Sequence, residues 1–167
     1  MANLSGILLN GTKLGRANLI GASLIEADLK ETIINDACLL KTDLTMANLS
    51  GAILSGSDLR RANLQGANLK GASLIETDLS GANLDEADLS GAFLSGANLR
   101  DAQLRGANLR DTKLRGGQLP DASIRDADLS KANLQGTDLR QAIVIAEQLE
   151  KAQSLKGATM PDGTIHP

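Results

Sequence analysis

A leucine recurs at every fifth residue from Leu4 onward, and the series runs without a gap to Val144. Among its 29 units, Leu is replaced only by Ile34, Ile124 and Val144. Two positions before each of these centre residues stands Ala, Ser, Thr or Gly, with Ile7 as the one exception. A repeat this regular indicates that one structural unit is used again and again along the chain.

A period of five residues fits neither a helix nor a straight strand. In an α-helix each step of five turns the side chain by about 140°, and in a strand it sends the next Leu to the opposite face. The chain must therefore turn once per repeat, with the small residue and the Leu on the same side of a short extended segment. This pattern predicts a solenoid with Leu and Ala inside.

The residue two positions after each centre is expected to form the corner. Of the 17 glycines, 13 stand there, and glycine readily adopts the positive φ of a type II turn. Where Glu26, Arg61 or Asp101 stands there instead, we expect a turn with negative φ. The two turn types should then be mixed along the chain.

The units Ala62–Gly66, Ala67–Gly71 and Ala87–Gly91 resemble the A(D/N)LXX units of the pentapeptide-repeat family, and the resemblance covers roughly residues 2–145. It implies an all-β fold, a right-handed quadrilateral β-helix with four faces and about 20 residues per coil. The 29 units would then make about seven coils. The end of the chain is similar to the tails of cyanobacterial members.

Two segments are expected, a β-helix over 1–145 and a C-terminal cap over 146–167. The repeat fails at Glu147, and the spacing of Ile145, Leu149 and Ala152 predicts a short helix over about 146–153 that lies on the last coil. Beyond it the five-residue motif resumes one residue out of frame, which indicates a partial extra coil.

The first coil has no such cap in the sequence. Bulky Ile7 and Leu8 are expected to plug the interior, but the backbone groups at a solenoid's end still need partners. End-to-end self-association through the N-terminal coil would supply them, and so would an upstream segment. The sequence leaves both alternatives open.

Nucleic acid is not an expected partner. The net charge is −3 and the aromatic content is 1%, so there is little to attract phosphates or to stack on bases. Arg100, Arg105, Arg110 and Arg115 form a run in the sequence, but their spacing puts one on each of the four faces.

Location is inferred from the N-terminus and from cysteine use. Met1 leads straight into the repeat, so we expect neither a signal peptide nor a membrane span. Cys38 is the only cysteine and stands at an outward position, which favours a reducing cytoplasm.

The sequence predicts no catalytic residue, no cofactor and no metal site. Asp or Asn occupies the position before the centre in 16 of the 29 units, and these short side chains are expected to bond neighbouring backbone groups beside the turn. His166 is the only histidine and is a poor metal site on its own. No nucleophile has a base beside it, and no phosphate-binding loop is present.

Function is predicted from one face of the β-helix. Its outward residues include Ile33, Ile53, Ile75 and Phe93, the only aromatic residue. We take these four as one side of an interface with an unidentified protein partner or a second copy, which makes the protein a non-catalytic scaffold. The alternative is that apolar residues have accumulated there by drift.

A rival hypothesis comes from the family resemblance. Some members resemble duplex DNA in shape and charge and modulate type II topoisomerases such as gyrase. DNA over a rod of ~34 Å carries ~20 negative charges, whereas the most acidic face here carries −3. An interaction scaffold is therefore favoured over a DNA mimic.

Overall fold

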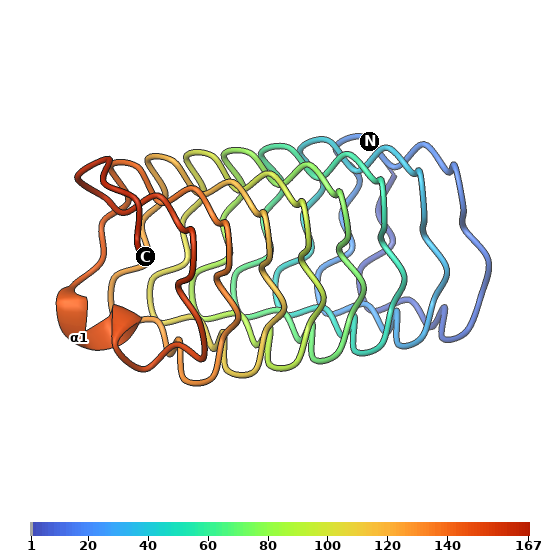
Figure 1. Ribbon diagram of the computed structural model, residues 1–167. Coiled ribbons are helices and arrows are strands. Elements are labelled where there is room, and N and C mark those ends of the chain that lie inside the picture. Colours follow the sequence, from blue (N-terminus) through green and yellow to red (C-terminus); the bar gives the residue numbers. More distant parts are fainter. Residues whose placement is uncertain (1) are drawn as a thin grey trace.

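The computed structural model describes residues 2–167, which wind into a rod of stacked coils (Figure 1). Parallel bridges join each outward residue to the one 20 positions later, from Asn3 with Ser23 to Ser123 with Ile143. Each strand is a single bridged residue between two turns. Because four bridges follow one another in each coil, the rod has four faces, named here after their first centre residues, Leu4, Leu9, Leu14 and Leu19.

Backbone hydrogen bonds connect every unit to the next coil. In the unit centred on Leu64, the Leu64 N–H donates to the carbonyl of Asn83 at 2.7 Å, and the Asn83 N–H donates back to Ala62 at 3.0 Å. The corner N–H of Gly66 donates to Asp85 at 2.9 Å. The same three bonds recur along the rod and fix the register at 20 residues.

The core consists of stacked Leu and Ala side chains. Leu84 and Ala82 are typical, with no exposed surface. Thr or Ser replaces Ala at some inner positions, and the hydroxyl then bonds to a backbone carbonyl, either of the preceding coil, as Thr77 does with Leu54 at 2.9 Å, or of the same coil, as Thr112 does with Leu109 at 2.7 Å. No buried side-chain N or O atom within residues 2–167 lacks a partner, so these polar residues fit the core without an unsatisfied group.

The expectation of mixed turn types is wrong. All corner residues from Gly6 to Gln141 have positive φ, 13 glycines and 15 other residues, and Glu26, Arg61 and Asp101 have φ of 56°, 56° and 58°. The ladder explains this, because the corner N–H must reach the next coil whichever residue stands there, as that of Arg61 does with Ser80 at 3.0 Å. A non-glycine residue in this conformation costs about 1–2 kcal/mol, which the ladder and the core offset.

A short helix lies at the C-terminal end of the rod (Figure 1). Helix α1, Ala146–Leu149, is shorter than the helix predicted over about 146–153. The buried side chain of Gln148 takes the place of the missing strand, since its Nε2 donates to the carbonyls of Ile124 and Ala127, both at 2.8 Å. Its Oε1 accepts from the N–H of Ile145 at 3.2 Å.

The ladder then resumes with a shift of one residue. Ser154 pairs with Asn133 and Thr159 with Asp138, which is the out-of-frame spacing read in the sequence. The chain finally folds back, and Ile165 makes an antiparallel bridge with Thr159. This return strand covers part of the last edge.

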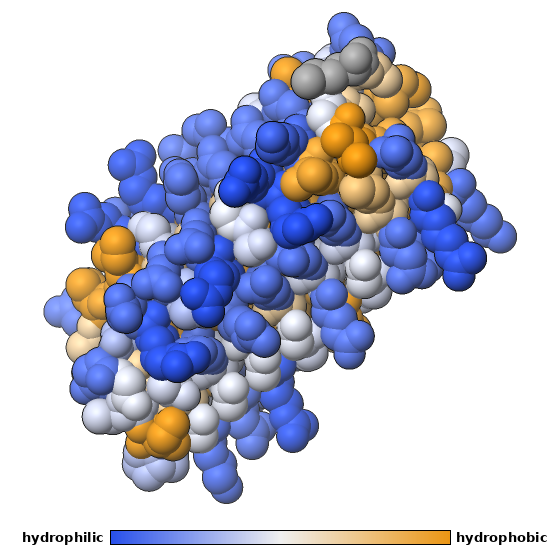
Figure 2. All heavy atoms as spheres, turned by 90° about the horizontal axis from the view of Figure 1, so that it is seen from above, coloured by the Kyte–Doolittle hydropathy of each residue, from blue (hydrophilic) through white to orange (hydrophobic). Residues whose placement is uncertain are grey.

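Within residues 2–167, no helix or further coil lies over the N-terminal coil. Leu8 does not plug the interior, because it stands at an outward position and is 76% exposed, whereas Ile7 packs against the core. Figure 2 shows hydrophobic residues gathered at this end. Within residues 2–167, four first-coil residues have no hydrogen-bond partner for either the backbone N–H or the backbone C=O. They are Asn3, Leu8, Lys13 and Asn18.

Residues 2–167 contain one helix, α1, and its four residues are far too few to cross a membrane.

The corner conformation gives a stability test at the exposed Lys131, which has φ of 60°. Lys131→Gly should raise the free energy of unfolding by about 0.5–1 kcal/mol over Lys131→Ala, because only glycine adopts positive φ without steric strain. The Ala variant is the matched control, since it removes the same side chain but keeps Cβ. Urea denaturation measures the difference, and a Gly variant less stable than the Ala variant would show that the corner is not strained.

Candidate binding face

The outward Asp and Asn side chains bond to the backbone, as the sequence predicts. Asp88 is typical, since its Oδ1 accepts from the N–H of Ser90 at 2.9 Å and from Nδ2 of Asn108, one coil on, at 3.1 Å. The first bond gives an acceptor to the backbone N–H of Ser90, the residue that follows the centre Leu89. We call such an N–H closed, and one without an acceptor open. Similar bonds close the equivalent N–H in Lys30, Thr45, Ser50, Arg60, Gln65, Lys70, Ser80, Asp85, Arg100 and Arg110.

Stacked carboxylates on the Leu19 face are tied to arginine. Asp58 lies one coil from Asp78, but the guanidinium of Arg60 bonds both Asp58 oxygens at 2.8 and 2.7 Å. These bonds hold the pKa of Asp58 below its usual value. Asp58 is therefore an ionised partner of Arg60 and is not suited to general acid catalysis at neutral pH.

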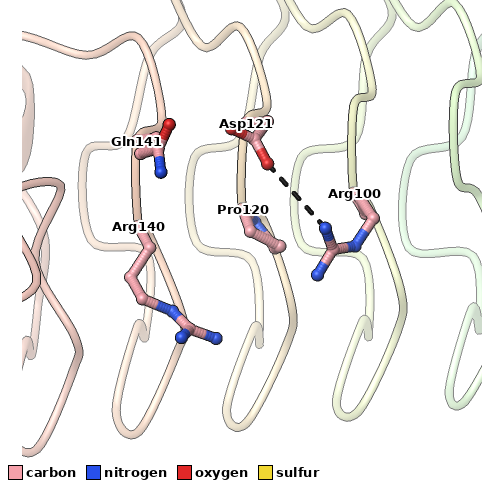
Figure 3. Close-up of a pocket in the computed structure, with 5 residues that line it drawn as sticks. All are labelled: Arg100, Pro120, Asp121, Arg140 and Gln141. Atoms are coloured by element: carbon pink, nitrogen blue, oxygen red, sulfur yellow. Dashed lines mark ion pairs between the residues drawn. The ribbon is translucent and has the colours of Figure 1, made fainter.

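A shallow pocket of about 170 Å³ lies further along the same face (Figure 3). Arg100 reaches Asp121 in it at 3.8 Å, and Arg140 is paired outside it with Asp138 at 2.6 Å. Both arginines already have a carboxylate partner, so the pocket offers an anion little unpaired charge.

Metal ligands do not gather in the part of the chain that the structure describes. No three His, Cys, Asp or Glu side chains there could hold an ion. His166 lies at the C-terminal end, with Nδ1 3.1 Å from the carbonyl of Pro167.

The predicted interface residues lie on the Leu14 face. Ile33 and Ile53 are bridged neighbours, and Ser73 separates Ile53 from Phe93 in the same column. The side chains of Ile53, Ile75 and Phe93 are 41%, 39% and 46% exposed, and Ile33 is half-buried. We call the four residues Ile33, Ile53, Ile75 and Phe93 the apolar strip.

Sequence reasoning missed a second feature of the same face. Where the outward residue is Lys, Ile, Ser or Phe, no Oδ1 accepts from the N–H after the centre. That N–H has no acceptor within residues 2–167 in six successive units of the Leu14 face. We call this set the open amide column; it consists of the N–H groups of Gly15, Asn35, Ser55, Ile75, Ser95 and Arg115.

The column is specific to this face. Elsewhere, open N–H groups at the same position are isolated from one another, at Asn10, Ile25, Leu40 and Arg125. The signal in the sequence is the lack of Asp and Asn at every twentieth residue from Lys13 to Lys113. It could have been found by asking which units lose the usual side-chain acceptor.

Charge on the Leu14 face is concentrated at its two ends. Lys13 and Arg16 stand at the first coil, and Lys113 and Arg115 stand beyond Phe93. Between them the face carries two carboxylates, Asp36 and Glu76. The apolar strip is thus flanked by positive charge.

The family model for pentapeptide repeats matches the chain in eight copies, over residues 2–39, 42–81, 62–101, 77–116 and 114–143. The chain belongs to the pentapeptide-repeat family. Proteins of this family form right-handed quadrilateral β-helices and are generally non-enzymatic scaffolds.

The chain is similar to solved structures of other pentapeptide repeat proteins. HetL, a pentapeptide repeat protein involved in heterocyst differentiation regulation in the cyanobacterium Nostoc sp. strain PCC 7120, is 34% identical, with 99% of this chain and 92% of HetL covered and a TM-score of 0.56. A protein of the Arabidopsis thaliana thylakoid lumen is 31% identical over 74% of this chain and 79% of its own, with a TM-score of 0.43.

QnrB1, a plasmid-mediated fluoroquinolone resistance protein, is 16% identical over 97% of this chain and 92% of its own, with a TM-score of 0.49. None of the curated proteins compared with the chain is significantly similar to it.

The outward Asp and Asn residues can be tested by truncation. Asp88→Ala should lower the free energy of unfolding by about 1–2 kcal/mol, because the Ser90 N–H and the Asn108 amide lose their acceptor. Ser123→Ala is the control, since Ser123 has the same outward place in its unit, while the N–H of Arg125, equivalent to that of Ser90, has no backbone acceptor within residues 2–167. Thermal denaturation compares the two, and equal losses would show that the side-chain bonds add nothing to stability.

Proposed function

We propose that this protein is a non-catalytic scaffold, a rod of about seven coils with α1 as its C-terminal cap, and that its Leu14 face binds a protein partner. The observation that carries the proposal is the apolar strip. Ile53, Ile75 and Phe93 are 39–46% exposed on one face, although the outward position is otherwise filled mainly by Asp and Asn.

The arrangement is typical of a contact surface. Interfaces have an apolar centre, often with an aromatic residue, and a polar rim. Phe93 and Ile53 supply the centre, and the charged residues at both ends of the face supply the rim. The family relationship supports a protein partner in general, without naming one.

A gyrase modulator is the alternative, and the charge distribution does not favour it. Duplex DNA carries about one negative charge per ~1.7 Å, whereas the Leu14 face has four cations and two carboxylates. The structural likeness to QnrB1 concerns the fold alone.

We also propose a cytoplasmic location. Cys38 is a free, partly exposed thiol, and a reducing compartment keeps such a thiol from oxidising. Fractionation of the native source cells tests this, and recovery in a membrane-enclosed oxidising compartment would contradict it.

The apolar strip is tested by the double variant Ile53→Ser with Phe93→Ser. Because both side chains project from the rod, stability should change little, while capture of partner protein from native lysate should fall at least about tenfold, as expected for the loss of two central apolar contacts. The matched control is Ile143→Ser with Ile165→Ser, which removes two exposed apolar residues elsewhere.

Unchanged capture by the strip variant would contradict the proposal. Inhibition or drug protection of gyrase by the purified protein in a supercoiling assay would favour the alternative.

The open first coil is a second proposed contact, for end-to-end self-association. Leu8 and Lys13 present both an N–H and a C=O without partners in residues 2–167, and two such edges can pair as antiparallel strands. Leu8→Pro removes one donor and breaks no internal bond, so it should raise the dimer dissociation constant in sedimentation velocity. A wild-type protein that stays at 17.4 kDa over the micromolar range would contradict this contact.

A further inference from the structure

The N–H groups of the open amide column point outward and can donate to a ligand. On the Leu9 face the equivalent N–H groups of Ser50, Lys70 and Ser90 donate to outward side chains. The same backbone conformation holds on the Leu14 face, where Gly56, Glu76 and Gly96 at the corners have φ of 70°, 55° and 68°. The N–H groups of Ser55, Ile75 and Ser95 therefore point to the side from which an acceptor would come.

The column repeats with the coil spacing, so it is a row of donors at intervals of about 4.8 Å. An extended peptide that runs along the rod advances about 3.3 Å per residue, and three of its residues span two coils. Such a peptide can place acceptors over the column at regular intervals.

Apolar side chains lie beside these donors. Ile53 and Phe93 stand two residues before Ser55 and Ser95, and Ile75 belongs to both the strip and the column. A ligand that engages the column is thereby brought against the apolar strip.

The net charge of the Leu14 face favours an acidic ligand over a basic one, because its four cations outnumber its two carboxylates, Asp36 and Glu76. Lys13 and Arg16 stand at one end of the column, and Lys113 and Arg115 stand at the other. N–H groups bond more strongly to carboxylates than to neutral acceptors, and Lys and Arg at the two ends attract the same negative charge.

From these observations we infer that the Leu14 face binds an extended, acidic peptide segment of a partner protein, whose carboxylates and carbonyls accept from the open amide column while its apolar side chains pack on the apolar strip. This inference rests on the proposed protein-binding function and adds the chemistry of the partner. The segment supplies the acceptors that Asp and Asn supply on the other faces.

Ser73, which lies between Ile53 and Phe93, allows one N–H of the column to be closed without removing an apolar residue. Its hydroxyl bonds that of Ser55 at 2.9 Å, and Ser73→Asn and Ser73→Ala both remove this hydroxyl. Asn48 and Asn68, at the equivalent outward position, close the N–H groups of Ser50 and Lys70. Ser73→Asn should close the N–H of Ile75 in the same way, with no change of charge and no apolar residue lost. Ser73→Ala keeps that N–H open, and Ser123→Asn makes the same substitution on the Leu4 face.

The test is fluorescence anisotropy with a labelled peptide of about nine residues that alternates Asp and Leu. A peptide that alternates Lys and Leu is the control probe. We expect the full-length protein to bind the acidic peptide at least about tenfold more tightly than the basic one, and Ser73→Asn to raise the dissociation constant of the acidic peptide about tenfold, the loss of one bond to a charged acceptor. Ser73→Ala and Ser123→Asn should leave it unchanged.

The outcomes separate this inference from the proposed function. No preference for the acidic peptide, or equal binding by Ser73→Asn and the wild type, would overturn the role of the column. If Ile53→Ser with Phe93→Ser still abolished partner capture, the protein-binding face would stand. Acidic-peptide binding that Ser73→Asn weakens but the strip variant does not would support the column and contradict the apolar strip.

Discussion

The backbone ladder between successive coils is the interaction on which the rest of this structure depends. Between the two ends of the rod, each unit makes the same backbone bonds to the units 20 residues before and after it, and this fixes both the register and the corner geometry. Arg61 and Glu76 adopt the same positive φ as Gly66 because the N–H of each corner must meet the next coil. Local preference is overridden wherever it conflicts with the ladder.

A second layer of hydrogen bonds lies outside the ladder, made by the outward Asp and Asn side chains. It closes the one N–H per unit that the ladder leaves unused, as Asp88 does for Ser90. On the Leu14 face this layer is missing in six successive units, and in three of them Ile33, Ile53 or Phe93 stands where Asp or Asn would be. One substitution pattern therefore creates both a row of donors and an apolar surface, which is why we regard the two as parts of one binding face.

Much of the architecture could be predicted from the sequence, because the five-residue period leaves few ways to bury the leucines. The buried Leu and Ala columns and the side-chain bonds of Asp and Asn follow from residue type and spacing alone. Two features could not be predicted in this way: the uniform corners depend on hydrogen bonds between coils, and Gln148 replaces a strand through its own side chain. The exposure of Leu8 does follow from the spacing, because Leu8 stands directly before the centre Leu9, and the expectation that it plugs the interior overlooked this place in the unit.

The proposed binding face could be derived from the sequence only in part. The apolar strip follows from counting outward residues by face, but the open amide column consists of backbone groups, which no search for reactive side chains reveals. The column is found only when the acceptor of every backbone N–H is identified, because its six N–H groups are among those left without an acceptor in residues 2–167.

Amide hydrogen exchange by NMR tests the central claim most directly. If the column is open, the N–H groups of Ser55 and Ser95 exchange much faster than those of Ser50 and Ser90, which hold the same place in the unit but donate to Asn48 and Asp88. Equal protection at all four serines would contradict the account, because it would mean that the Leu14 face supplies its own acceptors and has no donors left for a partner.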